Sequence, residues 1–379
     1  MVKINRNSDN QLIDSYMRGD FNLFSQLIKD GENVNCLNHE NNSLISLVVE
    51  NSNKLKNNKK FFDLLISNGV SLKQIGWEKD LLSICVIHQN DLYYAKKLLK
   101  NKIDINAKGV CRKYNYNTDG YLSVRFGPPI FDSIRMGKQK YFNLFLENNA
   151  DVGVIDNYGN TALHILINKS NGKYFEWDEK EIFEILLTRG ADPNIRSNDD
   201  MDTLNSIIFN EKNHLFPILF RKSKDININS RDCVSRTPLM NSIISDMPKL
   251  TKRLIKKQAN LDTYDFYENN ALVYCIRSQK FDLFKLIIEN GANIKSINRL
   301  GNNILHHIAD LERFLLDDDS NNNEFSEVIL NKHPELLMQK NIAQKTPLDM
   351  FKKHESYETR NKDFLKKFKN KIKSKETSR

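Results

Sequence analysis

Short segments with helical periodicity alternate along the chain with polar connections. Between residues 281 and 290, apolar side chains recur at helical spacing and polar side chains fall between them. The apolar members are Leu283, Phe284, Ile287 and Ile288, and the polar members are Lys285, Glu289 and Asn290. This spacing predicts a helix with one buried face and one solvated face. A series of such short helices predicts a structure in which neighbouring helices cover one another.

The ends of the predicted helices carry a second pattern, which recurs eight times. Gly or a small polar residue is followed by a small or acidic residue and then an apolar one, in 29–35, 67–72, 101–106, 147–152, 188–194, 222–227, 257–262 and 289–294. The first position of the pattern is Gly31, Gly69, Lys102, Asn149, Gly190, Ser223, Gln258 and Gly291, and three of the seven steps between neighbours are 33 residues long. Glycine at this position predicts a left-handed helix C-cap. The constant period predicts a repeat protein in which the longer steps are insertions.

A third pattern, a helix start, follows the loop in most repeats. It occupies 160–166, 236–243, 270–276, 302–308 and 345–351. Thr161 and Thr237 are placed to cap the next helix. Pro238 suits a first helical turn because its missing N–H needs no partner there. We therefore expect each repeat to be a pair of helices followed by a hairpin-like loop.

The loop pattern and the helix start, in this order and at this spacing, resemble the ankyrin-repeat family. Segments 160–164 and 236–240 are nearest to the family's T-P-L-H helix start. The resemblance extends over about residues 11–351 and implies an all-α solenoid of about nine helix-turn-helix repeats with a C-terminal capping helix. Repeats that begin near Asn41, Trp77 and Asp202 lack most of the helix start, so their assignment depends on the period and the hydrophobic pattern.

The domain organisation follows from the same period. We expect one repeat domain over 1–351, with insertions at 51–60, 108–127, 168–181 and 317–324, and a basic tail over 352–379. The insertion at 108–127 is basic and aromatic, and its second half alternates as a short β-hairpin does. Tyr116, Tyr121 and Arg125 lie in it. They belong either to an arm that contacts a partner, since Tyr and Arg are frequent at binding hot spots, or to a loop that covers one repeat.

The positive charge of the chain is concentrated at its C-terminal end. Lys and Arg number 57 against 48 Asp and Glu, a net charge of +9, and residues 351–379 alone carry a net +7. The tail therefore predicts a local basic patch, and the nearly balanced remainder does not predict a nucleic-acid-binding fold. Phe364, Leu365, Phe368 and Ile372 share one helical face. That face is expected to cap the last repeat; the alternative is weak contact of the tail with an anionic membrane or nucleic acid.

Motifs for catalysis are not found in the sequence. It has no phosphate-binding P-loop, no dinucleotide-binding glycine motif, no H-E-x-x-H and no G-x-S-x-G. We expect no enzymatic activity, no cofactor and no metal. His164 and His306 occupy the fourth position of the helix start, where the resemblance implies a hydrogen bond within the motif. Five scattered cysteines, a polar N-terminus and the absence of a long apolar run predict reduced thiols in the cytoplasm.

The leading functional hypothesis is a non-catalytic scaffold, monomeric by default, that binds another protein through hairpin tips and insertions. The candidate contact residues are Tyr116, Tyr121, Arg125, Tyr158, Arg196, Arg231, Tyr264, Phe266, Tyr267 and Arg299. The run 263–267, with three aromatic residues, is the strongest of these sites. Degenerate repeats and long insertions also resemble ankyrin proteins of intracellular bacteria and large DNA viruses, which implies delivery into a host cell by a non-classical route and action on a host protein. The alternative function is membrane or nucleic-acid association through the basic tail.

Overall fold

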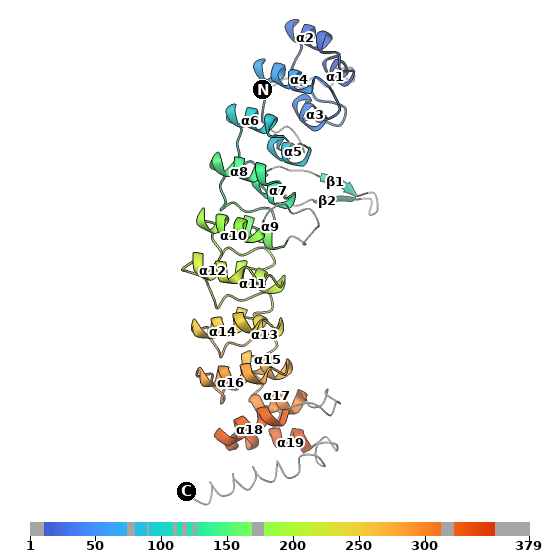
Figure 1. Cartoon of the computed structure of the whole chain (residues 1–379). Coiled ribbons are helices and arrows are strands. Elements are labelled where there is room, and N and C mark those ends of the chain that lie inside the picture. Colours follow the sequence, from blue (N-terminus) through green and yellow to red (C-terminus); the bar gives the residue numbers. More distant parts are fainter. Residues whose placement is uncertain are drawn as a thin grey trace, which may run out of the picture. The chain divides into compact units, whose positions relative to one another are not determined.

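A computed structural model of the chain describes residues 11–73, 80–88, 91–108, 112–115, 120–123, 127–168, 178–311 and 322–352. The chain divides into two compact units, Met1–Asn198 and Asp199–Arg379, which we call the first and the second unit. Apart from one two-stranded hairpin, the regular elements in the described ranges are helices (Figure 1). The predicted all-α architecture is confirmed.

The first unit holds five successive pairs of helices in its described part. The pairs are α1 (Gln11–Met17) with α2 (Phe21–Lys29), α3 (Leu44–Glu50) with α4 (Asn58–Ser67), α5 (Leu81–His88) with α6 (Tyr93–Lys100), α7 (Pro129–Arg135) with α8 (Gln139–Glu147), and α9 (Ala162–Ile167) with α10 (Glu179–Thr188). The first helices α3, α5, α7 and α9 pack in sequence order, and α2 packs on α4.

The second unit holds four further pairs and a short final helix in its described part. The pairs are α11 (Thr203–Phe209) with α12 (Phe216–Lys222), α13 (Pro238–Ile244) with α14 (Pro248–Lys256), α15 (Ala271–Arg277) with α16 (Phe281–Glu289), and α17 (Ile304–Leu311) with α18 (Asn322–Lys332). A 3₁₀ helix η1 (Pro334–Met338) leads to α19 (Pro347–Lys352), which packs on α17. Nine pairs and α19 agree with the predicted nine repeats and capping helix.

The helix boundaries have the local causes that the sequence indicates. Thr161 and Thr237 have extended backbones, and their side chains accept the backbone N–H of the third helical residue of α9 and α13. Pro238 is the first residue of α13. Gly190 and Gly291 follow α10 and α16 with φ angles of 91° and 95°, the left-handed conformation that glycine adopts at little cost.

Each repeat buries one face of its two helices against the next repeat. In α16, Leu283, Phe284, Ile287 and Ile288 are buried, and Lys285, Glu289 and Asn290 beside them are exposed, as the periodicity predicts. Phe284 and Phe281 of α16 contact Phe325 of α18 edge to face, with ring centroids 5.0 and 5.1 Å apart. Aromatic contacts of this kind join consecutive repeats.

The insertion at 108–127 contains the predicted hairpin. Strand β1 (Arg112–Asn115) pairs antiparallel with β2 (Gly120–Ser123), with Arg112 opposite Ser123 and Asn115 opposite Gly120. The insertion at 51–60 ends in the first turn of α4. Residues 169–177 of the third insertion, 317–321 of the fourth and 353–379 of the tail lie outside the described residues.

Candidate functional site

The hairpin loops share one side-chain device that fixes the conformation of their tips. An Asp or Asn accepts two backbone N–H groups with its Oδ1, from the residues two and four positions later. The residues that do so are Asn38, Asp156, Asp232, Asp265 and Asn298, at 2.8–3.0 Å. Because the Asp or Asn side chain lies on the inner side of the turn and satisfies its N–H groups, the side chains of the residues between them can face solvent.

Neighbouring hairpins are also bonded to each other. In the second unit, the backbone N–H of Phe266 donates to the Val234 carbonyl at 3.0 Å, and that of Ile342 donates to the Leu300 carbonyl at 3.0 Å. The N–H of Arg299 donates to Glu268 Oε2 at 2.9 Å. These bonds hold the tips in a fixed order, so their side chains form one preorganised surface.

Tyr267 is held by a buried polar network below its tip. The Tyr274 hydroxyl donates to Asp265, and Arg236 Nε donates to the Tyr274 oxygen at 2.9 Å. The Arg236 guanidinium lies 5.8 Å from the Tyr267 ring centroid. Burial, followed by the hydrogen bond to Asp265, raises the pKa of Tyr274 to about 12. The network therefore stays neutral at Tyr274 near neutral pH and supports the exposed ring above it.

Four of the predicted contact residues come together at one hollow in the second unit. Arg231, Tyr264, Phe266 and Arg299 all line a surface hollow of about 490 Å³. The Phe266 and Tyr267 side chains are 70% and 63% exposed. Tyr264 is half-buried, and burial raises its pKa. Two aromatic rings exposed to this extent on a fixed backbone are what a binding hot spot requires.

Three exposed apolar residues extend this aromatic pair and were missed by the sequence analysis. They are Ile297, Leu300 and Ile342, which are 49%, 57% and 70% exposed. We call Phe266, Tyr267, Ile297, Leu300 and Ile342 the tip surface. The signal was present in the sequence, because Leu300 occupies the hairpin position of Tyr267 and Ile342 that of Phe266. An aliphatic residue at such a position does not by itself indicate exposure.

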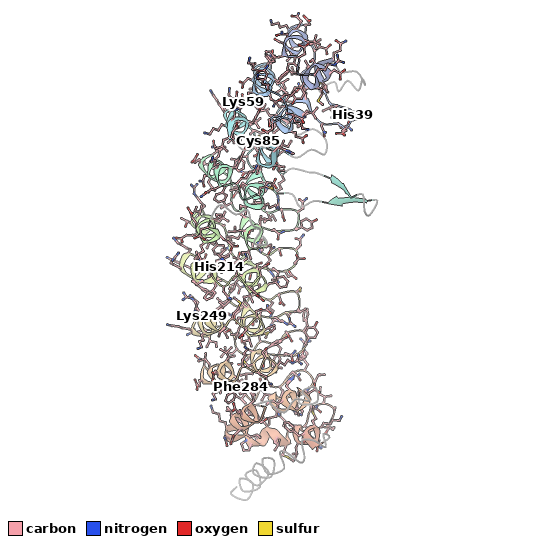
Figure 2. All side chains as sticks on the ribbon, turned by 45° about the vertical axis from the view of Figure 1, so that its right-hand side comes forward. His39, Lys59, Cys85, His214, Lys249 and Phe284 are labelled. Atoms are coloured by element: carbon pink, nitrogen blue, oxygen red, sulfur yellow. The ribbon has the colours of Figure 1, made fainter. Side chains whose placement is uncertain are left out.

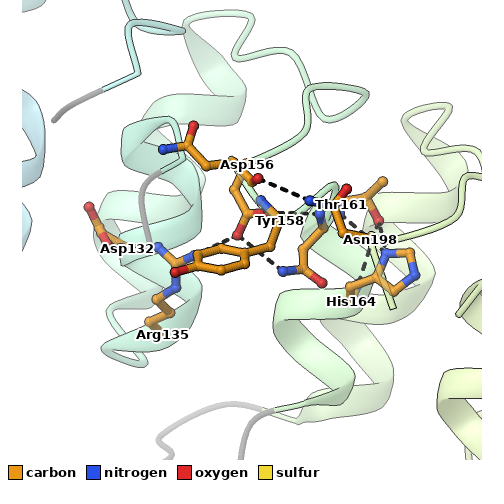
Figure 3. A network of polar contacts seen from close by, with 9 residues as sticks. Asp132, Arg135, Asp156, Tyr158, Thr161, His164 and Asn198 are labelled. Atoms are coloured by element: carbon orange, nitrogen blue, oxygen red, sulfur yellow. Dashed lines mark hydrogen bonds and ion pairs between the residues drawn. The ribbon is translucent and has the colours of Figure 1, made fainter. Parts of the chain in front are cut away.

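The predicted contact residues of the first unit are less well placed to contact a partner, because Tyr158 is not fully exposed. Asp156 accepts the N–H of Tyr158 and of Asn160 and lies 3.3 Å from Arg135 of α7 (Figure 3). The Tyr158 side chain is partly buried, and its carbonyl accepts the Asn198 N–H at 2.8 Å. Arg196 is exposed. Tyr158 thus contributes to the hairpin itself.

The remaining predicted residues lie in the insertion at 108–127. Tyr116 and Arg125 lie outside the described residues. Tyr121 lies in β2, where it pairs with Tyr114 of β1. The role of this segment as an arm stays a prediction.

The two motif histidines, His164 and His306, make polar contacts within the fold. His164 Nδ1 lies 2.9 Å from Thr161 Oγ1. His306 Nδ1 lies 2.9 Å from Asn303 Oδ1, and its Nε2 lies 3.1 Å from the Lys345 carbonyl. Burial lowers the pKa of His306. His164 thus contacts the helix start, and His306 contacts both the helix start and the next loop, as the family resemblance implies.

His307, the next residue, is expected to make the second unit less stable in acid. Burial, with a smaller contribution from Arg277, lowers the pKa of His307 from 6.5 to about 4. Because the fold favours the neutral ring, stability is full above pH 6.5 and is lost as the pH falls towards 4. We expect His307→Gln to gain about 2–3 kcal/mol relative to the unmodified chain between pH 7 and pH 4. Chemical denaturation at a series of pH values measures this.

His214 supplies the matched control, because its ring is exposed in the same unit (Figure 2). His214→Gln makes the same side-chain replacement at an exposed position and is measured over the same pH series. If both histidine variants behave alike, burial of His307 is not the cause of the acid sensitivity.

Metal binding and membrane insertion depend on the side-chain clusters and the helix lengths of the described ranges. Those ranges hold no group of three or more His, Cys, Asp or Glu side chains placed to bind a metal ion. None of their helices is both long and apolar enough to cross a bilayer. Cys36, Cys85, Cys233 and Cys275 are free thiols, and Cys233 alone of these four is exposed.

Comparison with known families decides the identity of the repeats. Residues 158–198 match the family model "Ankyrin repeat", and residues 204–298 match "Ankyrin repeats (3 copies)". These two segments are ankyrin repeats. Ankyrin repeats are modules of protein–protein interaction.

Similar proteins are found in large DNA viruses. An ankyrin repeat protein of Variola virus is 20% identical over 331 residues, which cover 84% of this chain and 47% of the viral protein. A putative ankyrin repeat protein of Acanthamoeba polyphaga mimivirus is 22% identical over 275 residues, 70% of this chain and 32% of that protein. The chain thus spans at most about half the length of these relatives.

Among solved structures, the ankyrin repeat domain of Bcl-3 aligns with 59% of the chain described here, and the alignment covers 92% of the Bcl-3 chain. The sequence identity is 16% and the TM-score is 0.44.

Proposed function

We propose that the protein binds another protein through the tip surface of its second unit. The observation that carries the proposal is the exposure of Phe266 and Tyr267, at 70% and 63%, on a backbone that hydrogen bonds hold in place. A folded protein gains nothing from large apolar side chains in water. In a complex the same side chains bury their area without first having to be ordered.

The rim of the tip surface fits the same function. Arg299 is 90% exposed and lies 3.4 Å from Glu268, which is 17% exposed. Arg231 also lines the hollow. A partner that covers the apolar tips would exclude water from these charges, and polar rim contacts of this kind fix orientation more than they add affinity.

The proposal is tested with two full-length variants. Phe266→Ser/Tyr267→Ser removes both rings from the tip surface and is expected to weaken partner binding by about tenfold or more, because hot-spot aromatics dominate interface energies. Phe209→Ser is the matched control: Phe209 is 77% exposed in the same unit, but it ends α11 at the far end from the preceding hairpin. A partner is first captured by chemical cross-linking and named by mass spectrometry, and its affinity is then measured for each variant.

Equal binding by the unmodified chain and the tip variant would overturn the proposal. Equal loss in both variants would also contradict it, because a general apolar effect would then be responsible. The expected pattern is loss in the tip variant and retention in Phe209→Ser.

Several finer features belong to the same proposal. The protein acts as a monomer in the cytoplasm, of its own cell or of a host cell, and its partner is a host protein; the viral relatives support this reading. The insertion at 108–127, with Tyr116, Tyr121 and Arg125, adds an arm to the binding surface, and Tyr158 and Arg196 add contacts in the first unit. Residues 1–351 form the repeat domain and 352–379 the basic tail.

The alternative function is association with an anionic membrane or a nucleic acid through the basic tail, which the net charge of +7 over 351–379 supports. It predicts that a chain ending at Lys352 loses all association and that salt weakens binding steeply. The scaffold proposal predicts that a discrete protein is retained by this shorter chain at high salt.

A further inference from the structure

Helix α14 carries an unusual row of positive charge on its exposed side. Its sequence and C-cap hold five cations and no acid. The five are Lys249, Lys252, Arg253, Lys256 and Lys257, and all of them are exposed. They recur at steps of three and four residues, so they form one stripe, which we call the α14 stripe. Eight residues of helix place its two ends about 12 Å apart.

The opposite face of α14 accounts for its place in the fold. Leu250, Thr251, Leu254 and Ile255 are buried, and they fix the helix against its neighbours. Like charges three and four positions apart destabilise a helix. Folding therefore has no need of the α14 stripe and is opposed by it.

Ion pairs with neighbouring side chains do not neutralise the α14 stripe. Within the ranges that the structure describes, none of the five cations forms a salt bridge. Other cations of the second unit do: Lys280 lies 2.7 Å from Asp246, and Lys295 lies 3.4 Å from Glu335. Within the described residues, the positive charge of the α14 stripe is therefore not compensated by an ion pair.

The neighbouring helix α12 widens the cationic surface. Arg253 and Lys257 lie 5.2 and 5.5 Å from the ring centroid of Phe220 in α12, so the α14 stripe extends to that helix. Exposed Arg221, Lys222 and Lys224 end α12 and follow it. Figure 1 shows α12, α14 and α16 stacked in this order, and Figure 2 places Lys249 at the α14 edge of the unit.

Helix α16 limits the surface on its other side. Asp282 and Glu289 are exposed there, and Lys285 between them lies 4.1 Å from the Phe281 ring centroid. A DNA duplex or a lipid bilayer extends well beyond two helices and would place its phosphates against these carboxylates. The exposed side of α14 also offers no aromatic side chain on which a base could stack. A short acidic peptide segment fits within the available length and width.

We propose that the α14 stripe, with the C-terminal end of α12, binds an acidic segment of a partner protein. The inference rests on the proposed scaffold function and adds a second contact surface, chemically distinct from the apolar tip surface. Glutamate and aspartate side chains of the partner supply counter-charges to the five cations of the α14 stripe.

A labelled deca-glutamate peptide is the probe, and binding to the full-length protein is measured by fluorescence anisotropy at low ionic strength. Lys249→Gln/Lys252→Gln/Lys256→Gln removes three charges from the α14 stripe and should weaken binding by about tenfold or more. The matched control Lys285→Gln/Lys295→Gln/Lys340→Gln removes three exposed lysines elsewhere in the same unit and should change binding by less than about twofold. Circular dichroism confirms that both variants remain folded.

Cross-linking the peptide to lysines with a carbodiimide separates the α14 stripe from the basic tail. Attachment at Lys249, Lys252, Lys256 and Lys257 supports the proposal. Attachment confined to 353–379, or equal weakening in both triple variants, overturns it. Tighter binding of a DNA duplex or of phosphatidylserine vesicles, lost in the α14 variant alone, would also overturn it by assigning the surface to phosphates. The tip variant Phe266→Ser/Tyr267→Ser should bind the peptide normally, so failure of the tip proposal is distinguishable from failure of this one.

Discussion

Replacing Phe61 with alanine is expected to lower the free energy of unfolding of the first unit by about 3–5 kcal/mol. Phe61 lies on α4, is fully buried, and contacts three aromatic rings edge to face. The ring centroids of Tyr16, Phe21 and Phe24 lie 5.3, 5.1 and 4.8 Å away. Alanine would leave a cavity between the first two repeats and remove all three contacts.

Leu23→Ala serves as the control, since Leu23 lies on α2 beside this cluster but is 43% exposed. It should change stability by less than about 1 kcal/mol. Urea denaturation followed by circular dichroism at 222 nm measures both variants. A loss below about 1 kcal/mol for Phe61→Ala would show that this cluster does not join the two repeats.

The second large effect is expected at Asp80, the residue that precedes α5. Its side chain is 5% exposed, and its Oδ1 accepts the Ser83 N–H at 2.9 Å. Burial raises the pKa of Asp80 from 3.8 to about 7. The fold therefore favours the protonated acid, and its contribution to stability is full below about pH 4 and is lost as the pH rises through 7.

Asp80→Asn keeps an oxygen for the Ser83 N–H and removes the ionisable group. At pH 8 it is expected to be up to about 4 kcal/mol more stable than the unmodified chain, and at pH 4 about equally stable. Asp20→Asn is the control, because Asp20 caps α2 in the same way but is exposed. Denaturation midpoints between pH 4 and pH 8 test this. A variant that is less stable at pH 8 would show that the charged carboxylate is stabilised in the fold.

The architecture was predictable from the sequence because each repeat uses the same local signals. Thr161, Thr237 and Pro238 set helix starts through bonds within one turn, and Gly190 and Gly291 set helix ends through backbone freedom alone. Signals of this range are visible in any single sequence. The period of 33 residues then places the repeats in order.

The contacts between repeats were not predictable in the same way. Phe61 meets Tyr16 and Phe24 across about forty residues of chain, and the sequence pattern shows only that each is apolar. Among the described residues, the absence of ion pairs on α14 likewise depends on the side chains of the neighbouring helices, which the sequence of α14 does not show. The same limit applies to exposure. The sequence analysis predicts exposed side chains for Phe266 and Tyr267 at a hairpin tip, but it does not predict the exposure of Leu300 and Ile342.

Hydrogen–deuterium exchange of the full-length protein, with and without the captured partner, tests most directly whether the tip surface binds. The proposal predicts slower exchange at the backbone amides of 264–268, 297–301 and 340–343 in the complex. The amides of α1 and α2, in the first unit, should exchange as they do in the free protein. Protection confined to the first unit or to 353–379, with the three tips of the second unit unchanged, would contradict the account.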